Sequence, residues 1–210
     1  MVSYVGQPIA IIAGESLKAI RHAKKKLRLL IKELTPILTI DEAIEAKQFI
    51  GDSRQFIQGD FEKAWKESEK NLKGTFVCSG QEQFYLESQA AIAWLGEEGE
   101  ILVHSSTQNT TEIQEVVAEV LGLNFNEVVC ICKRMGGAFG GKETQAVIPS
   151  VMAALVASKT KRPARVAYSK DDDMQSTGKR HPYKIHYKAA FTRKGEITGL
   201  KFDIFSNGGA

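Results

Sequence analysis

A glycine-rich segment between a predicted strand and a predicted helix is the part of this sequence best suited to chemistry. It reads Met135-Gly136-Gly137-Ala138-Phe139-Gly140-Gly141-Lys142-Glu143. An apolar run at 128–133 precedes it, and apolar residues at helical spacing over 147–159 follow it. Glycine lets a backbone approach a ligand closely, and amides near a helix N-terminus have partial positive charge. The segment therefore predicts a site for an anionic group.

The same segment admits a nucleotide-binding interpretation, because Gly136 to Lys142 satisfies the pattern Gly-x-x-x-x-Gly-Lys. Glu143 then stands where a Ser or Thr hydroxyl would bind magnesium, and a carboxylate there would repel nucleotide phosphates. Thr144 comes one position too late. A P-loop-like nucleotide-binding module is therefore an alternative hypothesis. A cofactor-free interaction fragment, in which the glycines only form turns, is a third.

Hydrophobic periodicity predicts strands and helices on both sides of this loop. Strands are predicted at residues 4–13, 75–78, 90–95, 101–105, 128–133, 165–168, 184–191 and 197–205. Helices are predicted from Ser16 to just before Pro36, over 60–71, over 111–121 with Thr111 and Gln114 as a capping box, and over 147–159. Residues 46–58 lose the periodicity and gather polar residues and glycine, which predicts a domain boundary there.

Composition and charge narrow the class of protein. The 210 residues are 43% apolar, which is ordinary for a packed core, and 28 basic against 25 acidic residues leave a net charge of +3. With so small a charge and no apolar run of about 18 residues, no nucleic-acid or membrane partner is expected. The N-terminus has no signal-peptide pattern, and Cys78, Cys130 and Cys132 are interpreted as small core residues. A reducing, cytoplasmic location is therefore expected.

Six segments form a recognisable series. In chain order they are Tyr4–Ala10, Gly80–Glu87, Ser106–Gln108, Arg134–Thr144, Asp171–Met174 and Thr177–Pro182. Together they resemble the xanthine dehydrogenases and related molybdenum hydroxylases, from about residue 3 to Ala210. The resemblance implies an α+β chain. Residues 1–50 would be the C-terminal part of an α/β hammerhead-like domain, and residues 51–210 the N-terminal part of a mixed α/β molybdopterin-binding domain.

The resemblance also implies a molybdenum–molybdopterin cofactor and assigns roles to four residues. Gln81 would hydrogen-bond an oxygen ligand of the molybdenum, and Phe139 and Gly140 would contact the cofactor through the backbone. Gln81 and Phe139 would thus touch the metal only indirectly, through its ligands. Glu143 resembles a purine-contacting glutamate, and relatives that oxidise aldehydes tend to have an apolar residue there. A purine such as xanthine or hypoxanthine is therefore the expected substrate, with an aldehyde-oxidising relative as the alternative.

The remaining expectations concern the complete enzyme. By resemblance, the catalytic glutamate lies downstream of Ala210, so no catalytic residue is expected within this chain, and the isolated chain should be inert. Iron-sulfur clusters and FAD are expected in other domains or subunits of the same enzyme, which is expected to be an oligomer. One residue departs from the family pattern: Ala138 stands where glycine is common, and its methyl group narrows the approach to the cofactor.

Overall fold

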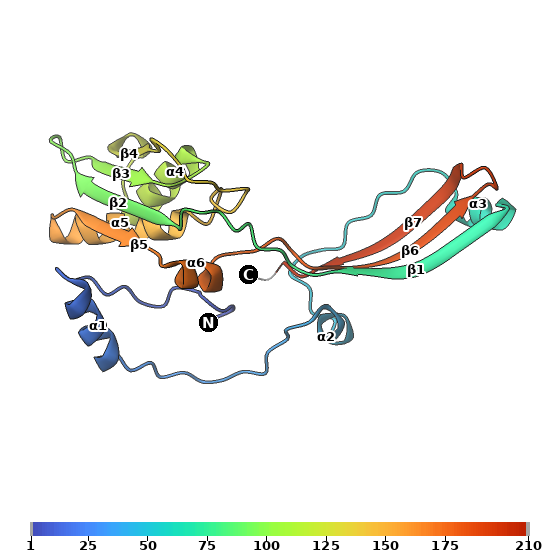
Figure 1. Cartoon of the computed structure of the whole chain (residues 1–210), viewed down its shortest axis with the longest axis horizontal. Coiled ribbons are helices and arrows are strands. Elements are labelled where there is room, and N and C mark those ends of the chain that lie inside the picture. Colours follow the sequence, from blue (N-terminus) through green and yellow to red (C-terminus); the bar gives the residue numbers. More distant parts are fainter. Residues whose placement is uncertain (1, 209–210) are drawn as a thin grey trace. The chain divides into compact units, whose positions relative to one another are not determined.

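The computed structural model describes residues 2–208 and divides into two compact units. The first unit contains Glu82–Lys179 and the N-terminal residues up to Ile31, and it includes the glycine-rich loop. The second contains Lys32–Gln81 and the residues from Arg180 onward. Figure 1 labels the helices and strands of both units. Within the described residues, no helix is long and apolar enough to cross a bilayer.

A four-stranded sheet forms the centre of the first unit, with strand order β4-β3-β2-β5. The bounds are β2 Ala90–Leu95, β3 Ile101–Ser105, β4 Val128–Ile131 and β5 Ala164–Ala167. β2 pairs antiparallel with β3 and β5, whereas β3 pairs parallel with β4. The turn at Gly96–Gly99 joins β2 to β3 as an antiparallel pair. Alternation along β2 buries Ala91 and Ala93, as expected for a sheet with one covered face.

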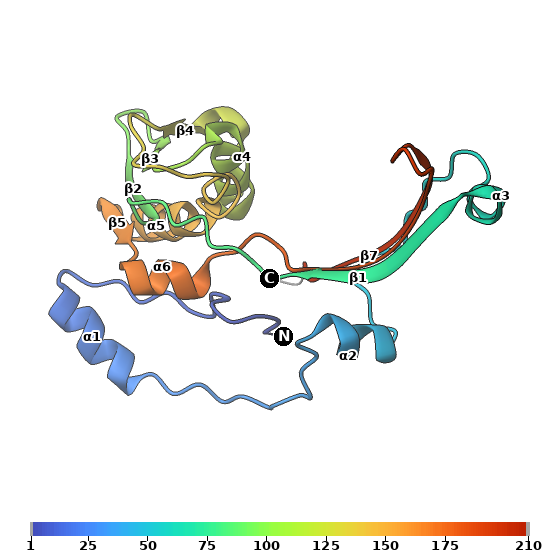
Figure 2. The same cartoon turned by 45° about the vertical axis from the view of Figure 1, so that its right-hand side comes forward.

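Two helices cover that face, α4 (Thr110–Leu121) and α5 (Val147–Thr160). Figure 2 shows both helices beside the strands. Small residues on α5 let its backbone lie close to the sheet, because an alanine adds only a methyl group to the interface. The fully buried positions of the two helices include Ile113, Val117, Ala153, Ala154 and Ala157.

The C-terminus of α4 agrees with the predicted end at residue 121, whereas its N-terminus corrects the prediction. Gly122 ends the helix with φ 68°, the left-handed conformation that favours glycine. The predicted capping box of Thr111 and Gln114 is wrong, because the N-cap is Asn109, whose side chain accepts from the amide of Glu112. Asparagine is among the strongest N-cap residues, and it begins the helix one position earlier.

The N-terminal segment differs most from its prediction. Ser16 does cap α1 (Leu17–Lys26), but the helix ends well before Pro36. Residues 4–13 are not a strand, since they have no partner strand among the described residues. α1 buries none of its residues, and Leu30 beyond it is 100% exposed. A helix with no surface on which to bury its apolar face gains little beyond intrinsic propensity, so the leucine periodicity alone does not extend it.

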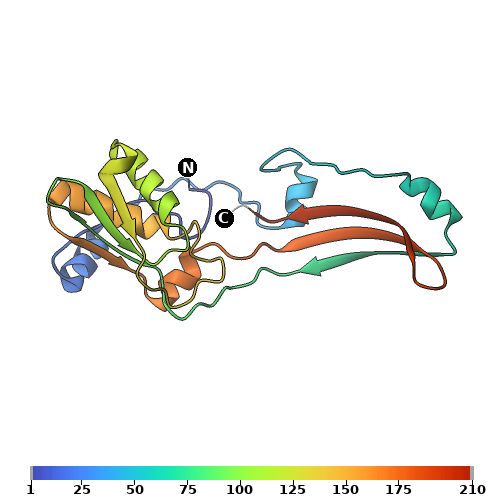
Figure 3. The ribbon, with the colours of Figure 1, turned by 90° about the horizontal axis from the view of Figure 1, so that it is seen from above.

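The second unit is built on a three-stranded antiparallel sheet with the order β1-β6-β7. Its elements are α2 Ile40–Glu45, α3 Phe61–Glu67, β1 Lys70–Cys78, β6 Tyr183–Phe191 and β7 Ile197–Ser206. Figure 3 shows the three long strands side by side. The helix predicted to begin at Asp60 is present, with Asp60 as its N-cap, but it ends at Glu67, four residues earlier than the predicted Asn71. α2, with a capping box from Thr39 and Glu42, was not predicted.

Cys130 provides a chemical test of packing in the first unit. It lies on β4 and packs against the buried core. Burial, and to a lesser degree the neighbouring Cys132, raise the pKa of the Cys130 thiol to about 11. The reactive thiolate is therefore scarce at pH 8. Its greater nucleophilicity offsets part of that loss.

We expect iodoacetamide at pH 8 to label Cys130 about twentyfold more slowly in the folded protein than in urea. The labelling rate should rise steeply with pH up to about 11. Site-resolved mass spectrometry provides the measurement, and the urea-unfolded chain is the reference. Equal rates in the two states would show that the thiol is not desolvated.

Candidate functional site

The glycine-rich loop, residues 135–143, leaves β4 and leads toward α5. Positive φ angles of 95° at Gly137, 53° at Phe139 and 88° at Gly140 fold its centre into an arch, defined here as residues 137–140. A positive φ is uncommon for an aromatic residue, and Phe139 also leaves 76% of its surface exposed. The arch thus presents both backbone and an aromatic ring to the exterior of the first unit.

The beginning of the loop is tied to Glu87. The Gly136 amide donates to Glu87 Oε2 at 2.5 Å, and the Glu87 amide donates to the Gly136 carbonyl at 3.2 Å. A Cβ atom at position 136 would come within 2.6 Å of Glu87 Cβ. Only glycine permits this approach, so the residue type at 136 follows from a contact with a residue 49 positions earlier.

The end of the loop is held by two glutamines. Gln89 Nε2 donates to the Gly141 carbonyl at 2.9 Å. Gln108 Oε1 accepts from the backbone amides of Gly140 at 3.0 Å and Lys142 at 3.3 Å. The backbone amide of Gln108 donates to the Lys142 carbonyl at 2.9 Å. These bonds hold the backbone on both sides of Gly141.

Lys142 points into the first unit and is fully buried. Its Nζ donates to Ser106 Oγ at 2.8 Å, lies 3.8 Å from Glu87 Oε1 and sits 4.8 Å from the centre of the Tyr85 ring. Desolvation lowers the pKa of Lys142, although the charges of Glu87 and Asp173 oppose this. A phosphate-binding lysine must reach outward to its ligand, so this orientation argues against the P-loop alternative.

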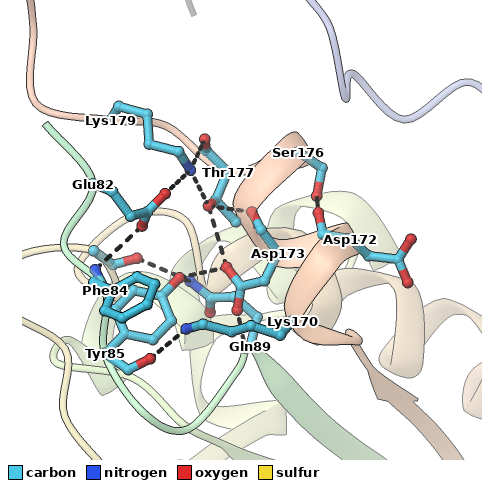
Figure 4. Close-up of polar contacts among 11 residues, drawn as sticks. Glu82, Phe84, Tyr85, Gln89, Lys170, Asp172, Asp173, Ser176, Thr177 and Lys179 are labelled. Atoms are coloured by element: carbon cyan, nitrogen blue, oxygen red, sulfur yellow. Dashed lines mark hydrogen bonds and ion pairs between the residues drawn. The ribbon is translucent and has the colours of Figure 1, made fainter. Parts of the chain in front are cut away.

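A buried polar network lies beneath the loop (Figure 4). Asp173, on the helix α6 (Lys170–Ser176), accepts from the Tyr85 hydroxyl at 2.6 Å, the Gln89 amide at 2.7 Å and Thr177 Oγ1 at 3.2 Å. Gln89 Nε2 also donates to the Tyr85 hydroxyl at 3.2 Å. Burial, with Asp173 as the next cause, raises the pKa of Tyr85 well above its ordinary value, so it remains a neutral donor.

The arch has three consecutive backbone amides that could bind an anionic cofactor. Those of Gly137, Ala138 and Phe139 have no acceptor within residues 2–208. A Cβ built on Gly140 meets nothing within 4 Å, so the space beside the arch is open. Successive amides in a turn form a concavity that attracts anions, and molybdopterin is anionic through its dithiolene and phosphate. The residues present therefore fit such a cofactor.

The predicted site residues are placed differently from one another. Phe139 and Gly140 share the arch, although the Gly140 amide already donates to Gln108. Glu143 follows the buried Lys142 and its side chain faces solvent. Gln81 belongs to the second unit, where its backbone pairs with Arg180 and its side chain is exposed. Its role at the cofactor stays a prediction.

The departure at Ala138 is accommodated. Ala138 is not among the residues with positive φ, and its side chain is buried. A methyl group therefore fits the backbone conformation without strain.

Glu87 and Gln108 lie in two of the six recognised segments, but the sequence assigned neither of them a role at the loop. Gln89 lies outside those segments. Their proximity to the loop in space is the informative feature, and no local pattern encodes it. Among the described residues, no group of three His, Cys, Asp or Glu side chains could hold a metal ion.

The fold and the loop together define a domain whose loop amides, unpaired among the described residues, suit an anionic cofactor. Residues 44–210 match the family model of the molybdopterin cofactor-binding domain. The chain belongs to this family, and the match confirms the predicted molybdopterin cofactor.

Two curated relatives support the assignment. The chain is 40% identical over 209 residues to a xanthine dehydrogenase of Emericella nidulans, covering 99% of this chain and 15% of that protein. It is 38% identical over 209 residues to the nicotinate hydroxylase hnxS of the same organism, covering 97% of this chain and 16% of that protein. The chain thus spans about one sixth of the length of these relatives.

A solved structure confirms the fold. The aldehyde oxidoreductase from Desulfovibrio desulfuricans superimposes with a TM-score of 0.83 over 98% of this chain and 24% of its own, at 20% identity. The likeness shows the fold alone, and it agrees with the predicted α+β class.

Proposed function

We propose that this chain forms one side of the molybdenum site in an enzyme that hydroxylates a purine such as xanthine or hypoxanthine. The observation that carries the proposal is the exposed carboxylate of Glu143 beside a clamped cofactor loop. The relative named xanthine dehydrogenase supports a purine, and the relative named nicotinate hydroxylase shows that a different heterocycle has to be tested.

Each residue has a defined task in this proposal. The bound cofactor supplies the oxidation of a ring carbon. The amides of the arch bind its anionic portion, and the Gln81 side chain donates to an oxygen ligand of the metal. Glu143 hydrogen-bonds the purine ring and orients it toward the cofactor. No residue of this chain takes the proton, a task that we assign to a glutamate elsewhere in the longer protein.

The domain division and the partners are part of the same proposal. We place the end of the hammerhead-like domain at residue 50, and the family match from residue 44 supports a boundary in this region. Iron-sulfur and FAD domains or subunits of the same enzyme would remove the electrons. The oligomeric state and the cytoplasmic location stay predictions.

The test uses the full-length protein that contains this segment, purified with its cofactor. Glu143→Ala should lower kcat/KM for hypoxanthine about tenfold, because one hydrogen bond to a charged group is lost. Both the unmodified enzyme and Glu143→Ala should oxidise nicotinate and benzaldehyde much more slowly than the unmodified enzyme oxidises hypoxanthine. Glu98→Ala, in the exposed turn between β2 and β3, is the matched control.

Two outcomes would contradict the proposal. Faster turnover of an aldehyde than of hypoxanthine by the unmodified enzyme would favour the aldehyde-oxidising alternative. An unchanged kcat/KM for hypoxanthine in Glu143→Ala would remove this residue from the substrate site.

A further inference from the structure

Glu87 contacts the glycine-rich loop at both of its ends. At the beginning, Glu87 exchanges two hydrogen bonds with Gly136, one from each backbone amide. At the end, Glu87 Oε1 lies 3.8 Å from the ammonium of Lys142. One carboxylate therefore spans the two points at which the arch joins the rest of the first unit.

The contact at the end of the loop is electrostatically significant because Lys142 is fully buried. Its ammonium has Ser106 Oγ as a hydrogen-bond acceptor at 2.8 Å, and Ser106 is neutral. A buried ammonium without a counter-ion is strongly destabilised. Glu87 makes the larger charge contribution at Lys142 and Asp173 the next, and only the Glu87 carboxylate lies within ion-pair distance. Removing that charge would favour movement of Lys142 toward water, and the loop backbone would move with it.

At the beginning of the loop, the backbones of Gly136 and Glu87 lie too close together to move further toward each other. A Cβ atom added at position 136 would lie only 2.6 Å from Glu87 Cβ, which shows how closely the two backbones approach. Burial acts to raise the pKa of Glu87, but hydrogen bonds from Ser106 and Gly136 and the charge of Lys142 bring it below its ordinary value. Glu87 is therefore ionised at neutral pH and can serve both contacts at once.

We propose that Glu87 is a positioning residue that holds the arch, residues 137–140, in the shape that presents its amides to molybdopterin. It acts through Gly136 and Lys142 and does not itself touch the cofactor. The inference rests on the proposed function, because it assumes that the arch binds the cofactor.

The experiment measures how long the full-length holoenzyme keeps its molybdenum. Glu87→Gln retains an oxygen that can accept from the Gly136 amide but removes the negative charge beside Lys142. We expect the variant to lose molybdenum about tenfold faster than the unmodified enzyme on dilution into buffer, as metal analysis after gel filtration would show. Circular dichroism on the same samples verifies that the protein remains folded.

Control variants separate positioning from a general loss of stability. Glu15→Gln removes another ion-paired carboxylate, from an exposed contact with Arg162 at 2.6 Å, and should keep molybdenum as well as the unmodified enzyme. Glu87→Gln combined with Lys142→Met removes the buried ammonium together with the carboxylate beside it. Because both changes act on one contact, the double variant should lose molybdenum no faster than the worse single variant.

The outcomes are distinguishable. Molybdenum retention in folded Glu87→Gln equal to that of the unmodified enzyme would overturn the positioning role. An unmodified enzyme that contains no molybdenum would instead refute the proposed function. If Glu87→Gln does not fold, Ser106→Ala weakens the same lysine contact more gently, with about a threefold faster loss expected; normal retention in that variant would also overturn the role.

Discussion

Replacing Asp173 with alanine is expected to lower the free energy of unfolding of the first unit by about 3–5 kcal/mol. Asp173 is only 2% exposed and accepts hydrogen bonds from Tyr85, Gln89 and Thr177. The variant leaves the Tyr85 hydroxyl and the Gln89 backbone amide without their acceptor. Each buried donor that lacks an acceptor costs about 1–3 kcal/mol. The loss should be large because the whole network depends on this carboxylate.

The measurement is urea unfolding followed by the fluorescence of Trp94, which lies on β2 in the first unit. A Trp65→Phe background removes the tryptophan of the second unit, so the signal reports one unit only. Asp172→Ala is the matched control: it is the adjacent residue in the first turn of α6, but it is exposed. It should cost less than about 1 kcal/mol. An equal cost for the two variants would mean that the buried network contributes little.

Truncation of Ile113 to alanine is expected to cost about 3 kcal/mol, within the range of about 2–5 kcal/mol found for buried aliphatic residues. Ile113 is 0% exposed and packs from α4 into the core of the first unit. Removing three methyl or methylene groups loses their burial and leaves a cavity that the sheet cannot fill. The same fluorescence measurement on the Trp65→Phe background determines the loss.

Val120→Ala is the control for this truncation, since Val120 lies on the same helix but is 46% exposed. It should cost less than about 1 kcal/mol, because nearly half of its surface is already in water. A small effect at Ile113 would indicate that the core of the first unit repacks easily.

Local patterns in the sequence predicted the central elements well. β2 and β3 begin and end at the predicted residues, because each is a short apolar run and the polar, glycine-containing turn at Gly96–Gly99 separates the two runs. Pro149 lies in the first turn of α5, where its missing amide has no helical partner to lose. Each of these features depends on neighbours within a few positions.

Features that depend on distant partners were missed or predicted wrongly. The leucine row after Ser16 has helical spacing, yet α1 ends at Lys26, since nothing buries the rest of that row. Asn109, rather than the predicted Thr111, caps α4. Several residues between β3 and α4 are of types that can cap a helix, and which of them does so depends on where β3 ends. α6, which supplies Asp173, has only seven residues and leaves little periodicity to detect.

In the glycine-rich loop, some properties depend on the local sequence and others on residues that are distant in the chain. Its sequence determined that the backbone would make a close approach and suit an anionic ligand, because those properties belong to glycine and to exposed amides. Only the tertiary structure decided that Lys142 turns inward to Ser106 and that Glu87 holds both ends of the loop. The physical reason is that these partners are 36 and 49 positions apart in the chain, and burial, which gives their charges such influence, exists only after the sheet and helices have packed.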